Sequence, residues 1–402
     1  MKKPTLPIHH GFITSVATFV FVLFSSHLWA LEITGTVGLE KRHFNDQESF
    51  LNQDDGGLSL KFQAEIRHKW DDNQKVITFV PFYRKDQTDD DRTHGDIRQL
   101  DFIAVDDNWE YQLGIGRVFW GVAESSHLVD IINQTDAVEN IDGEDKLGQP
   151  MVRASYLYGD GAVSLYVLPY FRERTFASAE GRLRPQLPVN TDDAQYESSK
   201  EKNHIDYALR LQHTIDEIDI GLSYFDGTSR EPDLIPNLIN HTLTPYYPQI
   251  TQLGLDLQFT GEEWLWKLEA INREFKHDRF HAEVAGFEYT IPRFMESYMD
   301  LGLLLEYHHD SRGEVAAARL QNDLFLGSRM VFNDLGDTEC LLGVYLDQDN
   351  NTKSYNIQFS RRFHDVFKLH VEAQLFEDVD KTDPLYDLRN DSYISVEMEY
   401  FF

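Results

Sequence analysis

The C-terminal end of the chain alternates between apolar and polar side chains. Counting back from the last residue in steps of two gives an apolar set: Phe402, Tyr400, Met398, Val396 and Ile394. Apart from Phe401, the residues between them are Glu399, Glu397, Ser395 and Tyr393. A period of two places successive side chains on opposite faces of a β-strand. The stretch therefore predicts a strand with one apolar face and one more polar face.

The same alternation recurs along most of the chain. In residues 58–70, one face carries Leu60, Phe62, Ala64 and Ile66, and the other carries Lys61, Gln63, Glu65 and Arg67. Short polar connections such as residues 71–74 and 106–108 alternate with long ones such as residues 86–96 and 172–203. This rhythm predicts an all-β, transmembrane, antiparallel up-and-down β-barrel of about 16–18 strands, with both termini at one end. A soluble sandwich or solenoid is the alternative.

The terminal strand resembles the last strand of Gram-negative outer-membrane β-barrels, which end in Phe after alternating apolar residues. The resemblance implies that Tyr400 and Phe402 form the signal read by the barrel assembly machinery, and that this strand closes the barrel. It also implies a bacterial outer-membrane location, in contact with lipid and lipopolysaccharide. Four tryptophans fall at the short-turn ends of the expected strands, where an aromatic girdle belongs: Trp70, Trp109, Trp264 and Trp266.

The N-terminal end has the pattern of a secretory signal peptide. Lys2 and Lys3 precede an apolar run at residues 12–24, and Ala30 offers a small residue at the expected cut. The run is too short for a stable transmembrane helix, and no later run approaches that length. We therefore expect residues 1–30 to be a signal peptide and residues 31–402 to be one barrel domain.

The composition narrows the possible partners. The formal net charge is -31, which disfavours a nucleic-acid partner because phosphate binding requires the opposite sign. Acidic loops could instead hold divalent cations that bridge lipopolysaccharide phosphates. Cys340 is the single cysteine, so no disulfide can form within the chain. Its alternation with Leu342, Val344 and Leu346 predicts that the thiol faces lipid.

Signals for enzymatic chemistry are weak. The chain has no Gly-x-Ser-x-Gly elbow, phosphate-binding loop or dinucleotide fingerprint, and no Ser/His or Asp/His arrangement can be assembled from the sequence. The acidic stretch from Asp142 to Asp145 lacks the spacing of a calcium loop, and a solvated turn is the preferred interpretation. We expect no enzyme, no cofactor and no metal.

The polar strand faces predict a charged, water-filled lumen, because a barrel this wide cannot be filled by one layer of side chains. Acidic and basic residues both fall on these faces, so ion selectivity stays open, and a plugged lumen is the alternative. The expected basic residues of the pore wall are Arg67, Arg210, Arg273, Arg329 and Arg362.

Residues 119–149 form a long connection that breaks the alternation. Long connections are usually functional or disordered, but this one has too many apolar residues for a solvated tail. We expect it to fold into the barrel, with an external cap over the loops as the alternative. Its acidic residues would then face wall arginines such as Arg67 and Arg210 and form a constriction: Glu124, Asp130, Asp136 and Glu139.

The start of this connection, Arg117-Val-Phe-Trp-Gly121, resembles porin-like barrels that have an Arg-x-x-Trp-Gly strand end and a long following loop. Some relatives of that kind are solute or polysaccharide channels. The charged, water-filled lumen expected above predicts a channel for passive diffusion of small polar solutes, and a homo-oligomer is a possible assembly. Two alternatives stay open. A barrel that exports an acidic polysaccharide would have a strongly basic lumen, and a barrel enzyme or adhesin would have a closed pore with activity at the loops.

Overall fold

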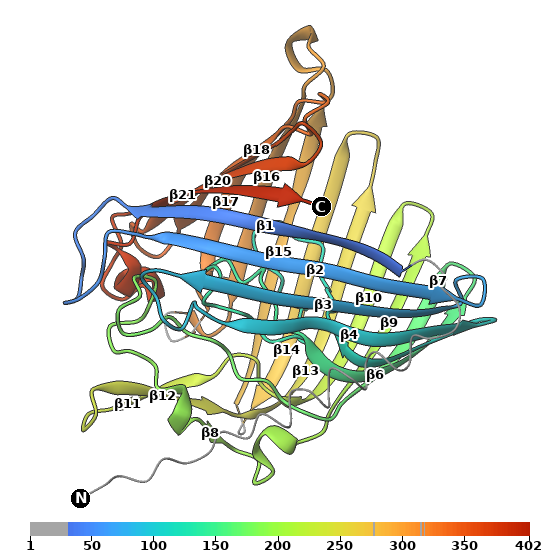
Figure 1. Ribbon diagram of the computed structural model, residues 1–402, viewed down its shortest axis with the longest axis horizontal. Coiled ribbons are helices and arrows are strands. Elements are labelled where there is room, and N and C mark those ends of the chain that lie inside the picture. The colour runs from blue at the N-terminus through green and yellow to red at the C-terminus, as the bar shows by residue number, and fades with distance from the viewer. Residues whose placement is uncertain (1–30, 276–277, 314–315, 317) are drawn as a thin grey trace, which may run out of the picture.

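The computed structural model describes residues 31–275, 278–313, 316 and 318–402. Eighteen strands form one antiparallel sheet in which each strand pairs with the next along the chain (Figure 1). The strands are β1 (Leu31–Phe44), β2 (Leu58–Trp70), β3 (Lys75–Asp86), β4 (Gly95–Asp106), β5 (Trp109–Gly116), β6 (Gln149–Tyr158), β7 (Gly161–Leu168), β9 (Asp206–Ile215), β10 (Ile218–Thr228), β13 (Gln249–Thr260), β14 (Trp264–Phe275), β15 (Asp278–Ile291), β16 (Asp300–Asp310), β17 (Asn322–Val331), β18 (Glu339–Asp347), β19 (Lys353–Phe363), β20 (Phe367–Glu377) and β21 (Tyr393–Phe401). The predicted signal peptide, residues 1–30, lies outside the described residues.

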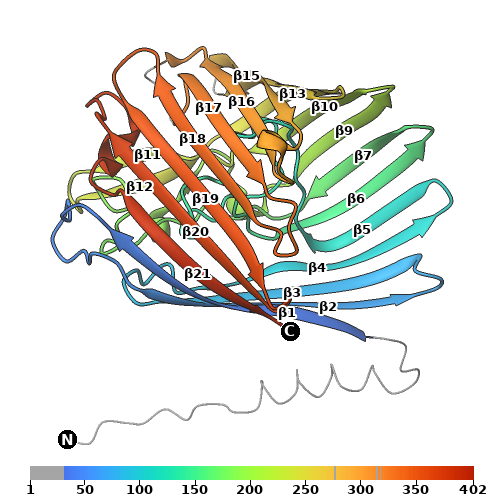
Figure 2. The same cartoon turned by 90° about the horizontal axis from the view of Figure 1, so that it is seen from above.

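The sheet closes on itself between β1 and β21 (Figure 2). The backbone of Gly35 exchanges two hydrogen bonds with that of Phe402, at 3.1 and 3.0 Å. A Cβ added at Gly35 would lie 2.5 Å from the Phe402 ring, so the last aromatic residue occupies space that only glycine leaves free. Closure confirms the predicted barrel and gives the upper of the two expected strand numbers.

The barrel has an apolar outer surface and a polar interior. In β9, Tyr207 and Leu209 are exposed, whereas Asp206 and Arg210 are buried. The apolar set of the terminal strand is likewise exposed, and Ser395 between them is buried. This is the reverse of a soluble sheet and suits a barrel surrounded by lipid. Cys340 lies on the same outer face as the exposed Leu342, as predicted.

Aromatic side chains gather on the outer surface at the short-turn end, which is the end where β1 begins and β21 ends. The Trp264 ring packs against Tyr289 at 4.5 Å and Trp266 at 5.6 Å, and Trp109 packs against Tyr156 at 5.0 Å. Amphipathic rings prefer a lipid–water boundary. The predicted girdle is therefore formed, and it marks where one edge of the membrane would lie.

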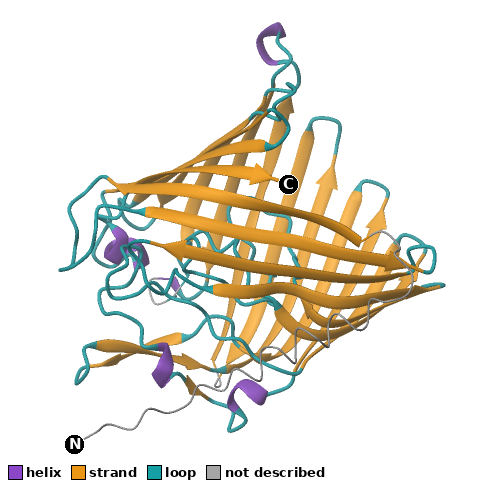
Figure 3. Ribbon diagram, viewed as in Figure 1, coloured by secondary structure: helices purple, strands orange, loops and turns teal. Residues whose placement is uncertain are grey.

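A second, smaller sheet lies among the long loops and was not predicted (Figure 3). It contains β8 (Gln195–Tyr196), β11 (Asp233–Asn237) and β12 (Thr242–Tyr247). Residues 195–196 fall in the long polar connection expected at residues 172–203, and the other two strands contain prolines, which cannot donate to a strand ladder. In the structure Pro236 lies opposite Leu243 and Pro245 lies opposite Leu234 in a short two-stranded hairpin, where a missing donor is tolerated.

The helical segments of the described chain are single short turns: η1 (Thr191–Asp193), η2 (Glu201–Asn203), η3 (Phe294–Glu296) and η5 (Pro384–Leu388). Within the described residues, no helix is long and apolar enough to cross a membrane.

Candidate functional site

Residues 117–148, here called the inner segment, connect β5 to β6 and lie inside the barrel. Their apolar side chains form a buried cluster with inward-facing residues of the barrel wall. The cluster includes Trp120, Val129, Ile131 and Ile132 of the segment, and Tyr166, Ala208, Phe225, Ile250 and Ile271 of the wall. The outer surface is apolar and exposed, so the segment's apolar side chains find their partners inside the barrel.

A glycine lets the segment approach the wall closely. Gly121 has φ +138°, a backbone conformation that side chains rarely adopt, and an added Cβ would lie 2.9 Å from Glu269 Oε1. Glu269, on β14, is fully buried. Its carboxylate accepts hydrogen bonds from the backbone N–H groups of Val122 at 2.7 Å, Ala123 at 3.0 Å and Val129 at 3.2 Å. A buried charge needs such donors, and here they belong to the segment's backbone.

A second wall carboxylate repeats the arrangement. Glu306, on β16, accepts from the backbone N–H of Glu124 at 2.7 Å and from that of Ser125 at 2.9 Å. Glu269 and Glu306 thus fix residues 122–125 through the backbone, whatever side chains those residues carry.

The Glu124 side chain points to neighbouring wall cations. It is paired with Arg329 of β17 at 2.5 Å and lies 3.7 Å from Lys267 of β14. Asp130 stays within the segment, paired with Lys146 at 3.1 Å and accepting from the Trp120 N–H at 3.3 Å.

Asp136 contacts three groups from other parts of the chain. Arg98 lies at 2.6 Å, His94 at 3.0 Å, and the Thr175 hydroxyl donates at 2.7 Å. Burial opposes ionisation of this carboxyl group, but the His94 hydrogen bond and the Arg98 charge lower its pKa to about 2. Asp136 is therefore charged across the physiological range.

Glu139 is held by an arginine that bridges two acids. Arg84, on β3, pairs with Glu139 at 2.8 Å and with Glu40 of β1 at 3.0 Å. Arg92, from the β3–β4 connection, forms a second pair with Glu40 at 2.9 Å. All four side chains are almost completely buried, so this network ties the segment to the β1–β4 side of the wall.

Three of these groups also have the spacing of metal ligands. The donor atoms of His94, Asp136 and Glu139 lie within 4.8 Å of one another. Arg98 and Arg84 already pair with the two carboxylates. Because these guanidinium groups supply the compensating positive charge, the cluster does not favour a cation, and we assign no metal site.

Four of the five arginines expected on the pore wall lie beside acids that belong to the wall or to its connections, not to the inner segment. Arg67 pairs with Glu65 on its own strand at 2.7 Å, and Arg210 pairs with Asp256 at 2.5 Å. The ion pairs of the segment's acids are instead formed with Arg84, Arg98 and Arg329. Arg273 pairs with Glu231 at 2.8 Å, and Arg362 lies near Asp337 at the short-turn end.

A β-bulge explains why Arg98 was missed. The β3–β4 register places Gln99 opposite Val80 and Ile97 opposite Pro81, so Arg98 has no opposite residue. A bulge shifts the alternation by one residue and turns the extra side chain to the other face. Pro81, which lacks a donor, was the only available signal of this irregularity.

The fold also assembles a Ser/His pair that sequence analysis did not find. Ser125 Oγ lies 2.7 Å from Nε2 of His308 and within hydrogen-bond distance of the Glu306 carboxylate. An ionised carboxylate only accepts, so the serine proton goes to Glu306, and Nε2 donates to Ser125. A histidine that donates to the serine cannot remove its proton. In this arrangement the pair anchors the segment to β16.

Among the cavities that border the inner segment in the described part of the chain, three have volumes above 200 Å³. The largest is about 370 Å³ and borders β14–β16 and the long loops. A second, about 220 Å³, borders β1–β4, and a third, about 340 Å³, borders β17–β20. Asn140 lines the first two, and Glu372 lines the second and third. The tip of the segment, at residues 140–142, therefore lies close to the boundary between these cavities.

No protein-family model and no curated protein matches the chain. Among solved structures, a mutant of the porin of Rh. blastica is 11% identical, and the match covers 93% of this chain and 100% of that chain with a TM-score of 0.46. A loop L8 deletion mutant of OmpT, an outer membrane protein of Vibrio cholerae, is 9% identical over 93% of this chain and 99% of that chain, with a TM-score of 0.46. Nothing about the solutes of this chain follows from these similarities.

The architecture itself is that of a transmembrane β-barrel. Eighteen antiparallel strands leave no free edge, the outer surface is apolar, and charged groups line the interior.

Proposed function

We propose that the barrel is a channel for passive diffusion of small polar solutes, and that the inner segment is its constriction. The observation that carries this proposal is the attachment of residues 122–129 to the inner wall by Glu269 and Glu306. A segment held there narrows the lumen without filling it, since cavities of 220–370 Å³ border it.

The charges around the segment support this function. Three acids of the segment pair with arginines on two sides of the wall. The pairs are Glu124 with Arg329 on β17, Asp136 with Arg98 on β4, and Glu139 with Arg84 on β3. Of these three pairs, Glu124–Arg329 is the one that is partly exposed, whereas the other two are buried. Opposed charges beside a narrow aqueous space create a transverse field, which orients polar solutes and water. Spaces of this size suit small solutes.

Export of an acidic polysaccharide is less well supported. That function requires a strongly basic lumen, but the buried interior carries many acids: Glu40, Asp101, Asp206, Asp256, Glu269, Glu306 and Asp323. Several of these acids are paired with arginines, as Glu40 is with Arg84 and Asp256 with Arg210, so the interior is mixed in sign and not strongly basic. An enzymatic role has less support than a channel, because the hydrogen bonds of Ser125 leave it without a base.

The test is the single-channel conductance of the purified protein in a planar bilayer. Replacing residues 123–146 by a short Gly/Ser bridge should clearly increase the conductance while the barrel still assembles. A matched variant shortens the β20–β21 connection at residues 379–382, which does not line the three cavities. Equal conductance and ion selectivity in the wild type and the 123–146 variant would show that the segment lies outside the permeation path.

We also propose that Tyr400 and Phe402 act as the assembly signal. Deleting Phe402, or introducing Gly35→Val beneath its ring, should leave unassembled protein in the periplasm. Normal outer-membrane levels and heat-modifiable gel mobility in both variants would reject this role. Recognition by the barrel assembly machinery, contact with lipopolysaccharide and a homo-oligomeric state are further predictions.

A further inference from the structure

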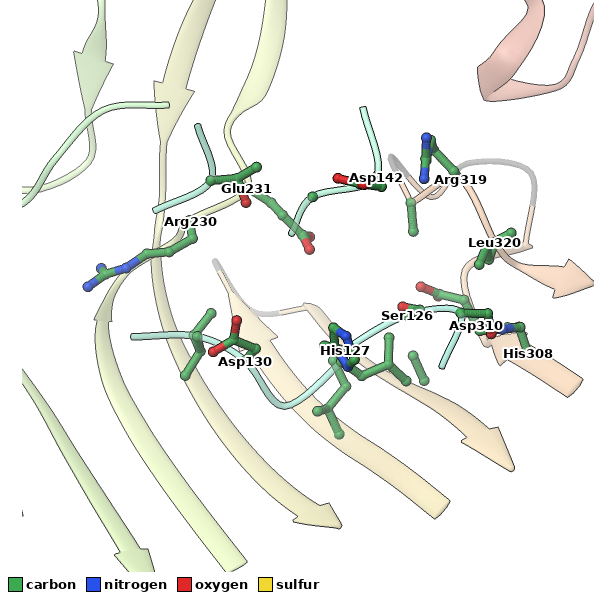
Figure 4. A pocket seen from close by; sticks show the side chains of 18 of the residues that line it. Ser126, His127, Asp130, Asp142, Arg230, Glu231, His308, Asp310, Arg319 and Leu320 are labelled. Carbon is green, nitrogen blue, oxygen red and sulfur yellow. Dashed lines mark hydrogen bonds between the residues drawn. The ribbon is translucent and has the colours of Figure 1, made fainter. Parts of the chain in front are cut away.

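The cavity of about 370 Å³ is lined by arginines from separate parts of the chain. They come from the β7–β9 connection, the β10–β11 connection, β14 and the β16–β17 connection (Figure 4). Three of them are already paired with acids: Arg230 with Asp206 at 2.7 Å, Arg273 with Glu231 at 2.8 Å, and Arg312 with Asp310 at 2.6 Å. Arg174 and Arg319 have no ion pair within the described residues.

Arg174 is held in place but not electrically compensated. Its backbone N–H donates to the Tyr247 hydroxyl at 3.1 Å, and Tyr247 is fully buried. Its side-chain Nε is inaccessible to solvent and has no hydrogen-bond partner among the described residues. Buried donors without partners are rare and costly, and they often mark the place of an ion or ligand.

The two arginines act on each other as like charges. Burial is the main influence that lowers the pKa of Arg174, and the Arg319 charge lowers it further, whereas Glu231 opposes the shift. Glu231 is already paired with Arg273. An anion bound between Arg174 and Arg319 would remove their repulsion and supply the missing partner.

The acids on the opposite side of the cavity are mostly compensated. Asp130 is paired with Lys146, and Glu144 lies 3.1 Å from His127. Burial opposes protonation of His127, but the nearby carboxylates of Glu144 and of Glu269, the latter at 3.7 Å, raise its pKa to about 10, so it is a cation at neutral pH. Glu283 borders the cavity but lies on the exposed face of β15, opposite the buried Ala282 and Val284. Asp142 also borders the cavity without an ion pair among the described residues, and burial raises its pKa to about 7, so the cavity repels an anion least below that pH.

We propose that this cavity binds a small oxyanion, the carboxylate or phosphate group of a permeating solute, between Arg174 and Arg319. The planar guanidinium fork matches both groups, which accept two parallel hydrogen bonds. The site lies on the long-loop side of the inner segment, so it would select solutes before the constriction. As a statement about selection, the proposal rests on the channel function proposed above.

The first test is isothermal titration calorimetry of the full chain in detergent micelles, with inorganic phosphate and with succinate as the two probes. Arg174→Gln and Arg319→Gln should each weaken binding by roughly tenfold, the loss expected for one charge-assisted hydrogen bond. The matched control is Arg279→Gln, which removes an exposed arginine paired with Glu274 at the same end of the barrel and should bind as the wild type does.

The second test is the block of chloride current by the same probes in a planar bilayer. Binding without any conductance would reject the channel and keep the site, whereas conductance without binding would reject the site and keep the channel. Binding of one probe alone would support the site and identify its chemistry. No binding of either probe, or equal binding in the two variants and the wild type, would overturn the proposal. Because Arg319 lies in a loop and Arg174 packs on Tyr247, the Arg319 variant keeps the test valid if the other fails to fold.

Discussion

The two sides of the barrel hold the inner segment in different ways. On the β14–β16 side, Glu269 and Glu306 bind backbone N–H groups of the segment. On the β1–β4 side, Arg84 and Arg98 bind the carboxylates of Glu139 and Asp136. The first attachment is made mainly to the segment's backbone, with one side-chain contact from Ser125. The second depends on both partners, so the two sides should respond differently to substitution.

Removing a wall carboxylate should have the largest effect. Glu269→Ala leaves three backbone N–H groups without an acceptor, at a cost of about 1–3 kcal/mol for each one that stays buried. The segment should therefore detach on this side, with cleavage near residues 122–129 in limited proteolysis and a higher, noisier conductance. Glu65→Ala, which removes a half-exposed partner of Arg67, is the control. An unchanged proteolytic pattern in Glu269→Ala would show that this attachment is not needed.

Breaking the buried network on the other side should come next. Arg84→Met leaves Glu139 and Glu40 without one of their cations, and breaking a buried pair costs about 3–5 kcal/mol. The urea midpoint of unfolding should fall, and Arg84→Met/Glu139→Leu should recover part of the loss because it removes the stranded charge. If the double variant is no more stable than the single one, the pairing argument fails.

A smaller effect is expected at Glu124, because this residue is attached both through its backbone N–H and through its side chain. Glu124→Gln removes the pair with Arg329 but keeps the backbone N–H that donates to Glu306. The pair is partly exposed, so stability should change by less than about 1 kcal/mol. The freed Arg329 charge should shift the reversal potential in a KCl gradient toward anions. A large loss of stability would mean that the side chain, not the backbone, positions residue 124.

The smallest effect concerns the pH dependence of the segment's tip. Burial, with the charges of Glu372 and Asp145, raises the pKa of Asp142 to about 7. The carboxyl group is neutral below that pH and negatively charged above it, so cation preference should increase as pH rises from 6 to 8. Asp142→Asn should remove this component of the change in reversal potential. The same pH dependence in Asp142→Asn and the wild type would assign the titration to another group.

The sequence by itself determined which way most strands face. A period of two depends only on the extended backbone, so the alternation in residues 58–70 and 394–402 was sufficient to separate the lipid-facing side from the interior. The number of strands followed from the rhythm of short and long connections. The inward fold expected for residues 119–149 followed from their apolar content, because the outer surface already has its own apolar partner in lipid.

Only the tertiary structure decided which charges meet inside the barrel. Arg84 and Glu139 are separated by 55 positions, and Glu124 and Arg329 by 205. Whether such residues reach each other depends on the tilt and stagger of the closed sheet. The bulge beside Pro81 turned Arg98 inward, and closure placed Ser125 beside His308. The face on which a side chain lies is a local property of its strand. Which charged side chains meet across the lumen depends on the position of every strand, so a shift of one residue in a single strand changes the pairs.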